Sequence, residues 1–287
     1  YGQRIGADGS ISGFGTNFPI CDHEGEQSYP SIAFDSATER FLVVWQDGRN
    51  GLFDIYGQLV NAADGTTFLG SDLQISGSGI DDDQELPQVS NVSANGRFLV
   101  VWEDLRNASP DIYGQLVTAG GALYLGTDIL ICGDPNIQGS PAAVYDNYNN
   151  RFLTVWQDQR NGPADIWGQY ISEAGVPDVS GNFAVQENGA IWYGNPFVDY
   201  NSNFHNFLTF FTSQEGPVYD LAFKLIGPPC PSLYVADGGA NSIDSWSKNA
   251  AGDIAPATSI RGNTRLNGPP GVAVYGDWMY VVVPNDN

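Results

Sequence analysis

Phe41-Leu-Val-Val-Trp-Gln-Asp-Gly-Arg-Asn50, followed closely by Asp54-Ile-Tyr-Gly-Gln58, is the stretch around which this chain is built. It recurs as Phe98-Leu-Val-Val-Trp-Glu-Asp-Leu-Arg-Asn107 with Asp111-Ile-Tyr-Gly-Gln115, and as Phe152-Leu-Thr-Val-Trp-Gln-Asp-Gln-Arg-Asn161 with Asp165-Ile-Trp-Gly-Gln169. A weaker fourth copy, Phe207-Leu-Thr-Phe-Phe-Thr-Ser213, precedes Asp220-Leu-Ala-Phe-Lys224. A period of roughly 55 residues is typical of propeller blades or a related array.

Each unit is predicted to hold four short strands. In the first unit these cover residues 31–35, 41–47, 54–60 and 72–76. The second strand is apolar on both faces, with Phe41, Val43 and Trp45 on one side and Leu42 and Val44 on the other. A strand coated by neighbouring sheets on both sides has this pattern. No stretch has the periodicity and caps of a helix. We therefore expect an all-β protein made of four-stranded antiparallel blades stacked as a β-propeller.

The unit boundaries predict one propeller over residues 1–287, with six blades, or five as the alternative. The tryptophan-type blades are expected at residues 30–76, 87–132, 141–186 and 196–226, each opened by a proline. Residues 1–21 match the second half of a unit, and residues 270–287 match a first half. We expect these two ends to share one blade and so close the ring. An alternative is a separate, truncated propeller over residues 230–287.

The C-terminal part has a different pattern. Leu233-Tyr-Val-Ala-Asp-Gly-Gly-Ala-Asn-Ser-Ile243 and Pro270-Gly-Val-Ala-Val-Tyr275 with Trp278-Met-Tyr-Val-Val282 resemble NHL-type propeller repeats, which predicts an NHL-like blade at residues 231–262. The resemblance implies a propeller fold and says little of function. The Trp-x-Asp-x-Arg and Asp-Ile-Tyr-Gly-Gln units resemble a repeat of uncharacterised bacterial secreted proteins.

Charge and composition exclude several classes of partner. The 287 residues carry 33 acidic and 11 basic side chains, a formal net charge of −22. Nucleic-acid binding needs clustered Lys and Arg, and an anionic membrane surface attracts the same residues. The chain has no apolar run of about eighteen residues, so we expect no membrane insertion. Abundant Gly, Asn, Ser and Tyr with few Lys favour a secreted or cell-surface protein, bacterial by its resemblance. The oligomeric state is open.

The repeated loop after the second strand places two carboxylates around one guanidinium. An Arg fork can bridge both carboxylates and hold the second and third strands together. Because the arrangement occurs in every unit, we interpret it as a structural clasp. A repeated sugar or cation site is the alternative. The predicted clasps comprise Asp47, Arg49 and Asp54; Asp104, Arg106 and Asp111; and Asp158, Arg160 and Asp165.

Two acidic sets are candidates for ligand binding or catalysis. Asp81, Asp82, Asp83 and Glu85 form the densest acidic loop, and oxygen ligands at this density suit Ca²⁺. No other cofactor is implied. Asp35, Asp146 and Asp199 lie near the ends of first strands and could line an axial pocket, as the carboxylates of a propeller glycosidase do. The competing interpretation is that these three Asp residues form turns.

The repeats preserve packing residues, and we find no unique polar constellation between them. A catalytic site occurs once, whereas a residue that maintains the fold recurs in each unit. We therefore expect a non-enzymatic, secreted or cell-surface propeller that serves as a binding or assembly module for a protein or a glycan. The alternatives are a carbohydrate-active enzyme, a glycoside hydrolase or lyase with axial carboxylates, and a multivalent lectin.

Overall fold

The computed structural model describes residues 1–5, 17–62, 70–77, 82–90, 93–107 and 109–227, together with the backbone of five strands between residues 232 and 282. The chain forms two compact units, Tyr1–Pro196 and Phe197–Asn287. No helix occurs among the described residues, and none of their segments is a helix that could cross a membrane.

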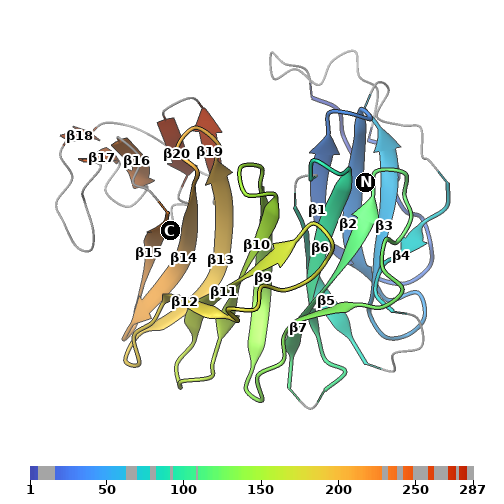
Figure 1. Ribbon diagram of the computed structural model, residues 1–287, viewed down its shortest axis with the longest axis horizontal. Coiled ribbons are helices and arrows are strands. Elements are labelled where there is room, and N and C mark those ends of the chain that lie inside the picture. The colour runs from blue at the N-terminus through green and yellow to red at the C-terminus, as the bar shows by residue number, and fades with distance from the viewer. Residues whose placement is uncertain are drawn as a thin grey trace. The chain divides into compact units, whose positions relative to one another are not determined.

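The strands of the first unit form three four-stranded antiparallel sheets, each in chain order (Figure 1). The first sheet holds β1 (Gln27–Asp35), β2 (Arg40–Asp47), β3 (Asp54–Asn61) and β4 (Leu73–Gln74). The second holds β5 (Gln84–Val89), β6 (Arg97–Asp104), β7 (Asp111–Thr118) and β8 (Ile129–Cys132). The third holds β9 (Gln138–Asp146), β10 (Arg151–Asp158), β11 (Asp165–Ser172) and β12 (Phe183–Gln186).

Two further sheets follow. One is three-stranded, with β13 (Trp192–Asn201), β14 (Asn206–Glu215) and β15 (Val218–Ile226). The other is five-stranded, in the order β18-β17-β16-β20-β19. Its strands are β16 (Ser232–Asp237), β17 (Ser242–Ser247), β18 (Thr258–Arg261), β19 (Gly271–Tyr275) and β20 (Trp278–Val282).

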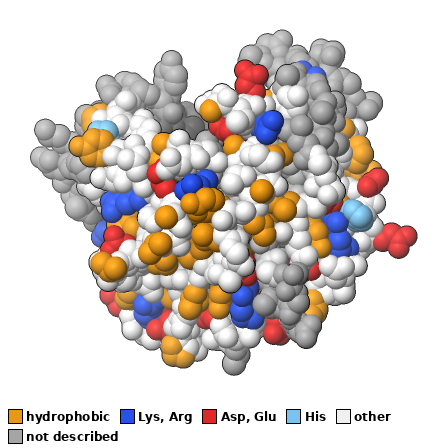
Figure 2. Space-filling model, turned by 45° about the vertical axis from the view of Figure 1, so that its right-hand side comes forward, with side chains coloured by type: hydrophobic (Ala, Val, Ile, Leu, Met, Phe, Trp, Pro, Cys, Tyr) orange, Lys and Arg blue, Asp and Glu red, His pale blue; other side chains and the backbone are white. Residues whose placement is uncertain are grey.

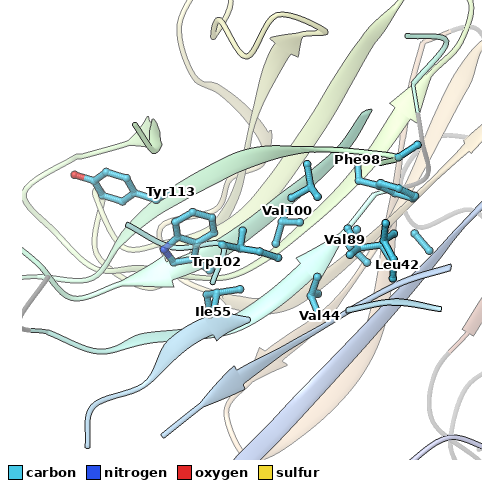
Figure 3. Packing of buried hydrophobic residues seen from close by; sticks show 13 residues of the cluster. Leu42, Val44, Ile55, Val89, Phe98, Val100, Trp102 and Tyr113 are labelled. Atoms are coloured by element: carbon cyan, nitrogen blue, oxygen red, sulfur yellow. The ribbon is translucent and has the colours of Figure 1, made fainter. Parts of the chain in front are cut away.

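Both faces of the second sheet are buried, as the sequence predicts. Phe98, Val100 and Trp102 of β6 pack toward the first sheet, against a cluster that includes Leu42 and Val44 (Figure 3). The alternate β6 residues belong instead to a cluster with Tyr145, Phe152 and Trp156 of the third sheet. Since side chains alternate along a strand, a strand that is apolar at every position can satisfy both neighbours only between two sheets.

The first strand of each sheet lies at the inner edge of the stack. β1 contacts β5 and β5 contacts β9, and Ser31 Oγ donates a hydrogen bond to Gln88 Oε1 at 3.3 Å. Four-stranded antiparallel sheets that pack face to face, with their first strands side by side, are blades of a β-propeller. The all-β propeller class is therefore confirmed.

The first strands β1, β5 and β9 each have a register shift beside a proline. The residue before the proline has a left-handed backbone in these strands and in β13, with φ between 48° and 52° at Tyr29, Leu86, Ser140 and Asn195. Such a conformation costs roughly 1–2 kcal/mol for a residue other than glycine. Proline is tolerated within a sheet at a bulge because no ladder hydrogen bond is then lost. The prolines therefore lie inside the first strands, which begin earlier than predicted.

The predicted ring closure is not found among the described residues. β20 pairs with β16 in parallel, at Ala236 and Val282, so the C-terminal strands complete a sheet with residues 232–261. At the N-terminus, Gly2 forms a bridge with Phe18. The boundary between the two units also falls at Pro196 and not at the predicted linker near residue 230. The side chains that carry the NHL resemblance lie outside the described residues.

We predict that shortening a side chain between two sheets destabilises the whole first unit. Phe98 is fully buried, so Phe98→Ala should lower the free energy of unfolding by about 3–5 kcal/mol. Urea denaturation followed by tryptophan fluorescence measures the loss. Val176→Ala, at a side chain that is 59% exposed, is the control and should change stability by less than about 0.5 kcal/mol. A similar small effect of Phe98→Ala would contradict the stacked-sheet packing.

Candidate functional site

The repeated motif builds one buried polar unit in each sheet, which we call the Asp–Arg clasp. In the first sheet Trp45 Nε1 donates to Asp47 Oδ2 at 2.8 Å, and Arg49 Nε and Nη2 donate to the same carboxylate at 2.9 and 2.6 Å. The Arg49 guanidinium lies over the Tyr56 ring, 4.0 Å from its centroid. Burial works to raise the pKa of Asp47, but the hydrogen bonds from Arg49 and Trp45 outweigh it and hold the pKa below its ordinary value.

The second carboxylate of the clasp is not the predicted one. Arg49 Nη2 donates to Asp72 Oδ2 at 2.8 Å, whereas Asp54 accepts a hydrogen bond from Asn50 Nδ2. In the second sheet Arg106 binds Asp104 and Asp128, and Asp111 accepts from Asn107. The guanidinium thus ties the second strand to the segment before the fourth. In the first two sheets the charged groups of the clasp are paired with one another, which does not support a repeated sugar or cation site.

The third clasp differs because Trp167 replaces the tyrosine of the other two copies. Asn50 and Asn107 donate both to the Asp and to the Tyr hydroxyl, at Tyr56 and Tyr113. Trp167 has no hydroxyl, and Asn161 Nδ2 donates to Glu187 instead. Among the described residues, the fully buried Asp165 Oδ2 and Trp167 Nε1 are left without a hydrogen-bond partner.

Arginine side chains outside the clasps also stack on aromatic rings. On the face shown in Figure 2, the Lys and Arg side chains that the structure describes lie singly and not in a patch. Arg97 stacks on Tyr124, 3.6 Å from the ring centroid, and Arg151 stacks on Tyr170 at 3.5 Å. The arginines therefore serve the packing of the sheets.

Two of the three axial candidates form turns. Asp35 accepts hydrogen bonds from Ala37 N and Thr38 Oγ1 in the loop between β1 and β2. Asp146 accepts from the backbone of Tyr148 and the side chain of Asn149 after β9. These contacts agree with the interpretation of Asp35 and Asp146 as turn residues and do not support the alternative that they are catalytic.

Asp199 is not equivalent to them in the repeat. The turn after β13 is formed by Asn201, whose Oδ1 accepts from Asn203 N at 3.0 Å. Asp199 lies two residues earlier, within the strand. Burial raises the pKa of its carboxyl group, and a hydrogen bond from Tyr200 N opposes the rise. Asp199 thus belongs to the second unit and is not grouped with Asp35 and Asp146 by the repeat.

The predicted calcium loop is only partly described. Asp81 lies outside the described residues, and Asp83 Oδ1 accepts a hydrogen bond from Phe53 N at 2.8 Å. Within the described ranges, no three His, Cys, Asp or Glu side chains are grouped so that they could hold a metal ion. Asp82 and Glu85 are thus not joined in such a group.

Each sheet of the first unit pairs two Asp residues between its second and third strands, but only the second sheet also pairs two carboxylates between its first and second strands. Glu85 on β5 lies directly opposite Glu103 on β6. Directly opposite residues share a face of the sheet, with Cβ atoms about 5 Å apart. The equivalent pairs are Ser28 with Gln46 in the first sheet and Gly139 with Gln157 in the third.

The Glu85–Glu103 pair lies at the inner edge, against the bulge of the third sheet. Ser140 N donates to Glu103 Oε2 at 3.4 Å, as Leu86 N donates to Gln46 Oε1 at 3.0 Å in the preceding interface. Both Glu side chains are half-buried. Glu103 therefore keeps the structural hydrogen bond of the repeat and adds a charge beside a second carboxylate.

The surroundings of the pair raise the pKa of both carboxyl groups. Burial raises the pKa of Glu103; the Ser140 N–H opposes this rise, and the negative charge of Glu85 adds to it. Burial also raises the pKa of Glu85, and the charge of Asp83 adds to that rise. Two neighbouring carboxyl groups with raised pKa values can share one proton, so that one acts as an acid and the other as a base.

The sequence contains the signal for this pair. Glu103 replaces the Gln of the other Trp-Gln-Asp motifs, and Glu85 stands where the neighbouring repeats have Ser28 or Gly139. The carboxylates predicted from the sequence lie at strand ends, where turns need them. The Glu85–Glu103 pair is brought together only by the register between β5 and β6.

The fold has known relatives, although no family model and no curated protein matches the sequence. An endo-arabinase from Bacteroides thetaiotaomicron is 11% identical, with 73% of this chain and 79% of that chain covered and a TM-score of 0.50. An N-acetylgalactosamine deacetylase from F. plautii, solved with blood group B trisaccharide, is 11% identical over 79% and 81%, with a TM-score of 0.48. A GH43 endo-arabinanase from Bacillus licheniformis is 12% identical over 90% and 88%, with a TM-score of 0.47.

These similarities correct two expectations from the sequence. The expectation of a non-enzymatic binding or assembly module is wrong, because the solved structures with this fold include glycoside hydrolases. For the same reason, the expectation that the protein is not an enzyme is withdrawn. The matched structures are not NHL proteins, and the NHL resemblance remains a prediction.

We predict that removing a clasp arginine destabilises the protein strongly. Arg106→Met leaves the fully buried Asp104 without its cationic partner, so the free energy of unfolding should fall by about 3–5 kcal/mol. Chemical denaturation measures the change. Arg40→Met is the control, because Arg40 donates to a backbone oxygen, that of Ala119, and leaves no carboxylate unpaired. Equal effects of the two substitutions would argue against the clasp.

We also predict that Asp165→Asn stabilises the protein at neutral pH. Burial raises the pKa of Asp165, so the ionised form is disfavoured in the folded state above that pKa. The amide removes this cost, and the gain should be about 1 kcal/mol at pH 7 and vanish as the pH falls below the ordinary value of 3.8. Thermal unfolding across this pH range is the measurement. Asp47→Asn is the opposite case and should lower stability at pH 7, since the hydrogen bonds from Arg49 and Trp45 hold the pKa of Asp47 below its ordinary value. A loss of stability in Asp165→Asn at pH 7 would contradict the prediction.

Proposed function

We propose that the protein is a carbohydrate-active enzyme that hydrolyses glycosidic bonds, with Glu85 and Glu103 as its acid–base pair. The observation that carries the proposal is that, among the three sheets of the first unit, only the second places two carboxylates opposite each other between its first and second strands. Repeated residues maintain the blades, whereas a catalytic pair is needed once. Glycoside hydrolysis requires a pair of carboxyl groups on either side of the scissile bond.

The electrostatics suggest a role for each residue. Glu103 is raised in pKa by burial and by the charge of Glu85, so it carries the shared proton and donates it to the leaving oxygen. Glu85 remains ionised and acts on the opposite side of the bond, as the base toward water or as the nucleophile. Ser140 N–H holds one oxygen of Glu103 and leaves the other available for the transfer.

The fold supports a carbohydrate substrate. The endo-arabinase from Bacteroides thetaiotaomicron shares the fold, which makes arabinan the first polysaccharide to test. The strongly acidic chain, with few Lys residues, also suits a secreted enzyme that meets its substrate outside the cell, and we propose an extracellular or cell-surface location. The lectin alternative receives no such support, because the repeated loops satisfy their own polar groups.

The test uses the residues of the neighbouring repeats as substitutions. Glu103→Gln installs the residue found at Gln46 and Gln157, and Glu85→Ser installs the residue found at Ser28. Both variants should therefore fold, with thermal midpoints within about 2–4 °C of the wild type. Release of reducing ends from arabinan and other polysaccharides should fall by a factor of about 10²–10⁴ in each variant.

Glu187→Gln is the matched control, since Glu187 is an exposed carboxylate outside the pair that accepts a hydrogen bond from Asn161 Nδ2. It should leave the rate unchanged. If Glu103→Gln and Glu85→Ser both hydrolyse the polysaccharide at the wild-type rate, the pair is ruled out. If the wild-type protein cleaves none of the polysaccharides, this result counts against a hydrolase.

A further inference from the structure

Glu103 extends into a space that exists because residue 139 has no side chain. A Cβ atom added at Gly139 would lie 2.5 Å from Glu103 Oε2 and 3.2 Å from its Cδ. Real Cβ atoms do not approach other atoms this closely, so an alanine would displace the carboxyl group. Gly139 is itself buried on β9, within the bulge region that ends at Pro141.

The corresponding position in the preceding interface does not need a glycine. There Gln46 Oε1 accepts the Leu86 N–H at 3.0 Å while the neighbouring residue, Glu85, carries a full side chain. At the following position of the repeat a glycine occurs again, since a Cβ atom added at Gly194 would lie 2.5 Å from Oε1 of Gln157, the equivalent of Glu103. What differs at the second interface is that the side chain reaching across is a carboxylate that faces Glu85.

We propose that Gly139 is a positioning residue for Glu103: its missing side chain and the adjacent Ser140 N–H seat the Glu103 carboxyl group between the second and third sheets, facing Glu85. The assignment of this seat to catalysis rests on the proposed function. The effect of the seat on the titration of the Glu103 carboxyl group can be measured without any substrate. The titratable group that faces Glu103 is Glu85 on β5, with Asp83 acting on Glu85. From β9, the facing groups are Gly139 and the Ser140 N–H, neither of which titrates.

A side chain added at residue 139 would have to displace the Glu103 carboxyl group. The atom nearest the added Cβ is the end of a flexible Glu side chain and not backbone, so the carboxyl group can shift at small cost in stability. The shift takes it out of its half-buried seat and away from the Ser140 N–H. Because burial is the main cause that raises the pKa of Glu103, a displaced carboxyl group titrates nearer its ordinary value of 4.5.

The experiment compares Gly139→Ala with the wild type by two independent measurements. The first is a pH titration of the Glu103 carboxyl carbon by NMR on glutamate-labelled protein, assigned with Glu103→Gln. We expect the Glu103 pKa to be lower in Gly139→Ala than in the wild type, with an unchanged thermal midpoint. The second is hydrolysis of the substrate found for the wild type, for which kcat should fall about 10- to 100-fold and the basic limb of the pH–rate profile, which reports the general acid Glu103, should move to lower pH.

Gly126→Ala is the matched control, because an added Cβ at Gly126 meets nothing within 4 Å. It should change neither measurement. An unchanged Glu103 titration in Gly139→Ala would overturn the proposal, and so would a titration change that Gly126→Ala reproduces. If the titration shifts as expected but the wild type cleaves no polysaccharide, the seat stands and the proposed function fails, so the two failures are distinguishable.

Discussion

Every sheet in the first unit depends on a fully buried carboxylate, Asp47, Asp104 or Asp158, that accepts hydrogen bonds from an indole and a guanidinium together. The tryptophan ring lies in the core, where its Nε1–H needs an acceptor. A carboxylate two residues along the strand points to the same face and supplies one. Its charge then requires the arginine, whose removal would leave the carboxylate buried and unpaired. The spacing Trp-x-Asp-x-Arg follows from these needs.

Stacking places a second constraint on the same strand. Because β6 is covered by a sheet on each side, the residues that alternate with Phe98, Val100 and Trp102 must also be apolar, and Leu99 and Val101 are. The first strands then lie side by side, and the bulges before Pro87 and Pro141 turn the N–H groups of Leu86 and Ser140 toward the preceding sheet. Side chains at the x position of the motif accept these hydrogen bonds, at Gln46 and Glu103.

The clasps of the first two sheets pair their own charged groups, so a departure from that arrangement is informative. Trp167 in the third sheet removes a hydroxyl and leaves Asp165 Oδ2 unsatisfied, which is a cost in stability with no evident ligand. Glu85 and Glu103 in the second sheet add two carboxyl groups where the first and third sheets have uncharged residues. The first departure is a packing exchange, whereas the second places two carboxyl groups with raised pKa values opposite each other. The second therefore carries the functional proposal.

The sequence by itself determined the repeat, the four-stranded antiparallel sheets and the burial of the second strand on both faces, because periodicity and alternation are properties of local order along the chain. It also identified the arginine of each clasp and its first carboxylate, Asp47 in the first sheet, which lie two residues apart. Only the tertiary structure decided that the second partner of Arg49 is Asp72 and not Asp54, that Asp35 and Asp146 form turns, and that Glu85 faces Glu103. These outcomes depend on register and on contacts between sheets, and a one-residue shift in register would have separated the two glutamates to opposite faces.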